Sequence, residues 1–103
     1  MVDEALLKEV VRRIVERAHP ERIMLFGSAA REEAGPHSDI DLLVVKRDAH
    51  RRKLAMDLYE ELADLGVPVD LIVATPEDLE RYGAWPGLVF EPALRDGKVV
   101  YAA

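Results

Sequence analysis

Two acidic side chains stand one residue apart at the start of an apolar run. Asp39 and Asp41 lead into residues 42–45, which are all leucine or valine. Side chains alternate between the two faces of an extended segment, so both carboxylates point to the same side. Two carboxylates at such short range repel each other and are expected to share a proton or to hold a cation. Mg²⁺ suits this arrangement, because it typically uses one or two carboxylates and completes its coordination with water and substrate phosphates.

A glycine-serine pair and a third aspartate could complete a site around this pair. Gly27-Ser28 ends an apolar run, and a turn there would supply the phosphate-binding side of the site. Asp70 lies within another apolar segment, where a charge is costly unless it is paired or coordinated. Taken alone, Asp39 and Asp41 fit polar residues at the end of a strand equally well. The Gly-Ser pair and Asp70 together favour the metal site.

The elements that must position these residues follow from hydrophobic periodicity. Apolar residues at helical spacing predict an amphipathic helix before the Gly-Ser pair, and a second helix that Asp48 caps and Gly66 ends. Thr75, followed by proline and two acids, predicts the start of a third, short helix. Residues 42–45 are apolar on both faces, which indicates a central strand. The predicted helices span residues 3–18, 48–66 and 75–83, and the predicted strands span residues 22–26, 39–46, 67–74 and 98–101.

Two of the predicted strands, 39–46 and 67–74, are joined through a helix. Strands connected in this way usually lie side by side in one sheet. We therefore expect an α/β (α+β) fold, in which a small mixed sheet packs against helices. If the two strands are neighbours, Asp70 joins Asp39 and Asp41 in a cluster of three carboxylates.

The second predicted helix begins with three cations, Arg51, Arg52 and Lys53. Positive charge at the start of a helix is the reverse of what the helix dipole favours, which suggests another use for these side chains. A basic face in contact with water is the commoner interpretation of such a run. Alternatively, these cations contact a triphosphate or an acidic partner.

Composition and charge restrict the class of protein. The 103 residues are 50% hydrophobic, which is enough for one domain, residues 1–103, with a single core. The chain has no cysteine, so disulfides, thiolate nucleophiles and zinc-thiolate sites are excluded. The net charge of -6 disfavours broad binding to nucleic acid. Neither a signal peptide nor an apolar run of about 18 residues is visible, so we expect a cytoplasmic protein that does not contact a membrane.

The residues that could do chemistry also match a known family. Gly27-Ser28, the Asp39-x-Asp41 pair and the later Asp70 resemble the nucleotidyltransferase superfamily, which includes the DNA polymerase beta palm and kanamycin nucleotidyltransferase. The strings L-F-G-S-A-A-R and S-D-I-D-L-L-V are similar to its smallest members, the minimal nucleotidyltransferases often encoded beside HEPN-domain partners. The resemblance implies a polymerase beta palm-like fold.

The resemblance also implies a role for each matching residue. Asp39 and Asp41 would bind two Mg²⁺ ions, one of them shared with the nucleoside triphosphate. Asp70 would bind the ion that activates the acceptor hydroxyl, and could accept its proton. Gly27 would let the backbone approach the phosphates, and Ser28 would hold their oxygens.

Arg31 would contact the triphosphate, and the chain departs from the family directly after it. The family usually has glycine at the next position, where this chain has Glu32, followed by Glu33. These two acids, close to the expected phosphate site, could change the conformation of the loop and lower its affinity for nucleotide. The metal-binding aspartates are unchanged.

The reaction implied by the resemblance is the Mg²⁺-dependent transfer of a nucleoside monophosphate, AMP from ATP, to a hydroxyl group. Small members of the family act as antitoxins that modify a HEPN toxin, so a HEPN-domain protein is the expected partner and acceptor. The acceptor surface would come from that partner or from a second subunit in a homo- or hetero-oligomer. The alternative is a binding protein that neutralises a HEPN toxin by contact, with its catalysis weakened by Glu32 and Glu33.

Overall fold

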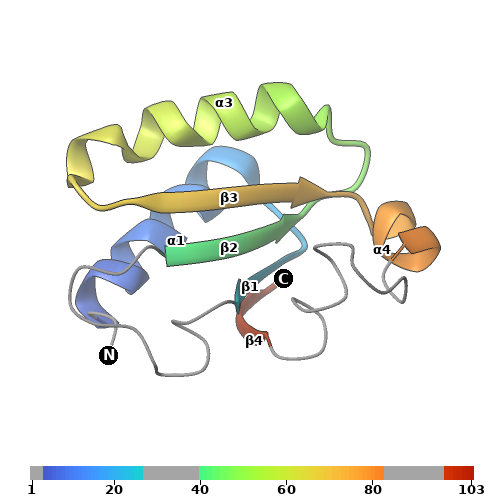
Figure 1. Ribbon diagram of the computed structural model, residues 1–103, viewed down its shortest axis with the longest axis horizontal. Coiled ribbons are helices and arrows are strands. Elements are labelled where there is room, and N and C mark those ends of the chain that lie inside the picture. The colour runs from blue at the N-terminus through green and yellow to red at the C-terminus, as the bar shows by residue number, and fades with distance from the viewer. Residues whose placement is uncertain (1–3, 27–39, 83–96) are drawn as a thin grey trace.

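The fold is a four-stranded sheet with helices packed against it (Figure 1). The computed structural model describes residues 4–26, 40–82 and 97–103. The described helices are α1 (Glu4–Ala18), α3 (Arg51–Leu62), the 3-10 turn that follows it (Ala63–Leu65) and α4 (Pro76–Tyr82). The described strands are β1 (Arg22–Phe26), β2 (Ile40–Val45), β3 (Val69–Ala74) and β4 (Lys98–Ala102).

The sheet is mixed, with the strand order β3-β2-β1-β4. β1 pairs antiparallel with both β2 and β4, whereas β2 and β3 are parallel neighbours joined through α3. The expectation of a small mixed sheet packed against helices is therefore confirmed. So is the side-by-side arrangement of the strands that carry Asp41 and Asp70.

The core lies on both faces of β2, which is why its sequence is continuously apolar. Alternate residues of the sheet pack under α1 and α3, where Val10, Ile14 and Leu58 are fully buried. We call this side the helix face. On the opposite face, Leu43 and Val45 pack with Leu79 of α4 and with apolar residues of β1 and β3. Burial on both sides confirms that β2 is a central strand.

The start of α3 differs from the prediction. Its N-cap is His50, whose Nδ1 accepts a hydrogen bond of 3.2 Å from the Lys53 backbone N–H. Asp48, which we expected in this role, lies in the preceding turn with a φ of 58°. Aspartate tolerates this left-handed conformation better than most residues, so Asp48 serves the turn rather than the helix. The far end is as predicted, because Gly66 has a φ of 67° and ends the helical segment.

A tyrosine of α3 reaches the outer edge of the sheet. The hydroxyl of Tyr59 accepts a 2.8 Å hydrogen bond from the backbone N–H of Leu71, in β3. β3 is the terminal strand on this side of the described sheet. The bond therefore pairs a backbone group that β2 does not reach.

Among the described residues, none of the helices combines the length and the apolar character needed to cross a membrane.

Reciprocal hydrogen bonds fix the start of α4. The Asp78 N–H donates to the Thr75 hydroxyl over 3.1 Å, and the Thr75 N–H donates to the Asp78 carboxylate over 3.0 Å. Thr75 is thus the helix cap that the sequence predicts. The hydrogen bond from the Thr75 backbone, with smaller help from the Thr75 hydroxyl and Arg51, lowers the pKa of Asp78. The charged form of Asp78 is favoured in the folded protein.

Replacing Asp78 with asparagine removes this charge, and we expect the free energy of unfolding at pH 7 to fall by about 1 kcal/mol. A lowered pKa adds stability above the ordinary pKa of aspartate, near about 4, and the gain is lost as the pH falls through the lower value in the folded state. The difference between the variant and the wild type should therefore shrink towards pH 2. Urea denaturation at pH 7 and in acid measures both effects. Glu80→Gln, an exposed acid of the same helix, is the control. An equal loss at both pH values would contradict the assignment.

Candidate active site

Asp41 and Asp70 lie opposite each other on neighbouring parallel strands. The pairing register of β2 and β3 aligns these two residues directly. Adjacent strands are about 4.8 Å apart, and residues in register point to the same face of a sheet. The two carboxylates therefore share one face at the amino-terminal ends of both strands. This juxtaposition is the one that the proposed metal site requires of them.

The pair lies on the face of the sheet opposite to α1 and α3. Along β2, Ile40 and Leu42 belong to the core under these helices, whereas Leu43 packs on the other side with Asp41. Phe26, the last residue of β1, is the register partner of Asp41 on its other side. One row across three strands thus reads Phe26, Asp41, Asp70.

The sequence analysis did not single out Phe26. The signal was present, because Phe26 ends the strand that leads to the Gly-Ser pair and shares its face with Met24. Its position beside Asp41 followed only from the antiparallel register of β1 and β2. Phe26 is half-buried and occupies the side of Asp41 that Asp70 leaves open.

The exposure of the two aspartates differs from the expectation in one respect. Asp41 is half-buried, but Asp70 is exposed. We expected Asp70 to lie in the middle of a strand, where a charge needs compensation. It is instead the second residue of β3, because the strand begins at Val69. The expected burial of Asp70 is therefore wrong, and its place in the site rests on register alone.

Four of the predicted site residues lie outside the described residues: Gly27, Ser28, Arg31 and Asp39. Among the residues that are described, no group of three or more acidic, histidine or cysteine side chains could hold a metal ion. The described part of the site is the pair Asp41 and Asp70.

The chemistry of this pair fits a magnesium ion. Both side chains offer hard carboxylate oxygens. They belong to residues of β2 and β3, strands that the core of the sheet holds in place. Mg²⁺ commonly uses one or two carboxylates and keeps several waters or phosphate oxygens as its other ligands. The exposure of Asp70 leaves room on its side for such ligands.

The cations at the start of α3 lie at the other end of β2. Val45 is four positions beyond Asp41, about 13 Å along a strand, and the cluster begins only beyond that point. These side chains do not face a triphosphate bound beside Asp41. That interpretation of the cluster is wrong on geometric grounds.

Acids also pair with cations in and near this basic cluster. Arg47 pairs with Glu21 at 3.0 Å, and Arg51 pairs with Asp78 at 3.2 Å. A cavity of about 220 Å³ beside Lys46 and Lys53 is lined by two acids as well. The cluster is a mixed-charge surface rather than a strong anion site.

Comparison with known proteins assigns a family to this arrangement. A family model described as a nucleotidyltransferase domain matches residues 7–94. A protein of Methanocaldococcus jannaschii named "Putative protein adenylyltransferase MJ1305" is 28% identical, with 76% of this chain and 61% of that protein covered. The chain thus spans about three fifths of the length of this relative.

Two solved structures share the fold. One is a toxin-antitoxin with AMP-PNP, at a TM-score of 0.67 and 20% identity, which covers 93% of this chain and 73% of the other. The second is the toxin-antitoxin MntA-HepT, at a TM-score of 0.59 and 20% identity, with 98% and 74% covered. Together with the match over residues 7–94, the mixed sheet shows that this chain belongs to the nucleotidyltransferase domain family.

Proposed function

We propose that this protein transfers AMP from ATP to a hydroxyl group of a partner protein, a HEPN toxin that it neutralises. The observation that carries the proposal is the register that sets Asp41 against Asp70 at one end of two parallel strands. The relative named as a protein adenylyltransferase supports a protein acceptor. The related toxin-antitoxin with AMP-PNP supports an adenine nucleotide and a protein partner.

The reaction is an in-line displacement at the α-phosphorus of ATP. The acceptor oxygen forms a bond to this phosphorus while the bond to the bridging oxygen of the β-phosphate breaks, and pyrophosphate leaves. The proton of the acceptor hydroxyl passes to the Asp70 carboxylate. Because Asp70 is exposed and lies on the terminal strand β3, a hydroxyl presented by a large partner can reach it.

Asp41 and Asp70, together with Asp39, would hold two Mg²⁺ ions. When bound, magnesium supplies positive charge to the phosphate oxygens as negative charge shifts to the leaving group. Gly27, Ser28 and Arg31 would hold the triphosphate. Phe26 is the register partner of Asp41 on β1, and Asp70 is its partner on β3.

Direct binding is the competing function. In that case the protein neutralises its toxin by contact alone, with Glu32 and Glu33 reducing its affinity for nucleotide. The two functions differ in what happens to Asp41 variants, because a binding protein does not need the carboxylate.

Millimolar Mg²⁺ should stabilise the protein through these carboxylates. At a concentration ten times the dissociation constant, binding to the folded state adds about 1.4 kcal/mol, which raises Tm by about 6 °C in a domain of this size. Asp41→Asn should abolish the shift, and Asp70→Asn should reduce it. Thermal unfolding with and without Mg²⁺ measures the effect.

Glu60→Gln is the matched control, because Glu60 is an exposed acid on α3, which lies on the other face of the sheet. It should keep the full shift. An equal response of all three variants would show that Mg²⁺ acts on the surface in general and not at the aspartate pair.

Transfer itself is tested with α-labelled ATP, Mg²⁺ and a purified HEPN-domain protein. We expect the label on the partner with the wild type and none with Asp41→Asn. Asp70→Asn should lower kcat by about 10²- to 10⁴-fold, the usual contribution of a general base, with a smaller effect on KM. Gel electrophoresis and mass spectrometry locate the label.

Glu60→Gln again serves as the control and should transfer at the wild-type rate. A stable complex that forms without any label, and forms equally well with Asp41→Asn, would establish direct binding in place of transfer.

A further inference from the structure

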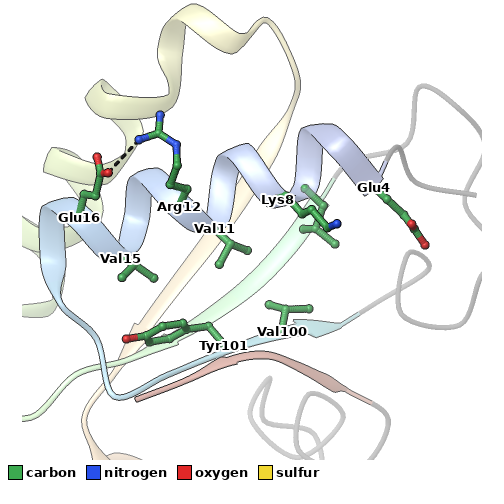
Figure 2. A pocket seen from close by; sticks show the side chains of 9 residues that line it. Glu4, Lys8, Val11, Arg12, Val15, Glu16, Val100 and Tyr101 are labelled. Atoms are coloured by element: carbon green, nitrogen blue, oxygen red, sulfur yellow. Dashed lines mark hydrogen bonds and ion pairs between the residues drawn. The ribbon is translucent and has the colours of Figure 1, made fainter.

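A groove of about 720 Å³ runs between α1 and β4 (Figure 2). It lies on the helix face of the sheet, opposite to Asp41 and Asp70. Its apolar floor comes from both elements: Leu7, Val11 and Val15 are spaced four residues apart on α1, and Val100 and Tyr101 belong to β4. All five side chains are half-buried.

An irregularity of β4 builds half of this floor. Ile23 pairs with Tyr101, but the next residue, Met24, pairs with Val99, so Val100 is an extra residue in the strand. In a regular strand, neighbouring side chains point to opposite faces. Here Val100 and Tyr101 both pack against the core of the helix face. The β-bulge therefore turns a second apolar side chain into the groove.

The two long helices do not cover this part of the sheet. α3 packs on β3 and on α1, which leaves α1 as the last described helix before β4. The described residues that line the groove all belong to α1 and β4. β4, the edge strand, therefore lies beyond the part of the sheet that the two long helices cover.

The rim of the groove carries an ordered set of charges. Glu4, Lys8, Arg12 and Glu16 follow one another at four-residue intervals along α1 and all line the groove. Their order is negative, positive, positive, negative. Arg12 is paired with Glu9 at 2.6 Å and with Glu16 at 2.9 Å, which offset its charge, so Lys8 is the main positive charge of the described rim.

We propose that this groove binds an amphipathic helix of a partner protein, whose polar edge is acidic at the centre and basic at both ends. The rim from Glu4 to Glu16 is about 18 Å long, three helical turns, and a helix packed beside α1 would lie about 8–10 Å from its axis. Such a helix would set its apolar residues on Val100 and Tyr101 in the usual helix-in-groove manner. Its charges would complement those of the rim.

In one arrangement, the same charges disfavour a second copy of this chain as the occupant. If α1 of another copy lay antiparallel in the groove and in line, Glu4 would face Glu16 and Lys8 would face Arg12. Each of these contacts pairs like charges, which is unfavourable across an interface. The inference does not depend on the transferase activity, because the groove and the aspartate pair lie on opposite faces of the sheet.

Two stapled helical peptides test the charge order. Both peptides carry leucines at the same positions, two glutamates and two lysines. The matched peptide has its glutamates at the centre and its lysines at the ends, and the swapped peptide has the reverse order. Fluorescence anisotropy with the full chain should give about fivefold tighter binding of the matched peptide at low salt. High salt should reduce this preference.

Two variants locate the binding. Val100→Lys places a charge on the groove floor and should weaken the matched peptide at least tenfold. Met56→Lys is the control, because Met56 is a 62% exposed apolar residue of α3 that does not line the groove. This variant should bind the matched peptide as tightly as the wild type does. Circular dichroism and Tm establish that both variants are folded.

Lys8→Glu changes only an exposed charge of the rim and should abolish the preference for the matched peptide. Binding of neither peptide below 1 mM, or equal binding of both that Val100→Lys leaves unchanged, would overturn the proposal. Analytical ultracentrifugation tests whether a second copy is the occupant. A dimer of the wild type that Val100→Lys dissociates would assign the groove to self-association instead.

Discussion

Parallel pairing of β2 with β3 is the constraint on which the candidate site depends. The core sets this register, because Leu71 and Val73 are buried on the helix face, together with Leu42 and Val44. A slip of one residue would expose these side chains and turn Asp70 towards the helices. Burial of apolar side chains thus holds the two carboxylates side by side, although neither takes part in the core.

The two faces of the sheet separate two kinds of surface. One face carries the aspartate row, in which an exposed Asp70 and a half-buried Asp41 lie in different environments. The other face carries the helices and, beyond α1, an apolar groove that the described helices leave open. A partner held at the groove would occupy none of the space in front of the aspartates. Anchoring and chemistry can therefore involve different parts of a partner, or different partners altogether.

The sequence predicted the elements well where periodicity and turn chemistry agree. Residues 22–26 form a strand as expected, and Thr75 caps α4 through the side chain that its type suggests. The start of α3 was wrong because Asp48 and His50 can both accept from a helix N–H, and only the length of the turn after β2 decides between them. The burial of Asp70 was misjudged because an apolar run does not reveal where pairing begins. The bulge at Val100 leaves no mark in composition. The roles of Gly27, Ser28, Arg31 and Asp39 stay predictions.

The hydrogen bond between Tyr59 and Leu71 has a consequence for how molecules can join. A strand added to the outside of β3 would need the N–H of Leu71 for its ladder, and the phenol already occupies it. Tyr59 thereby closes one hydrogen-bonding position on the outer edge of β3 to a strand added from outside.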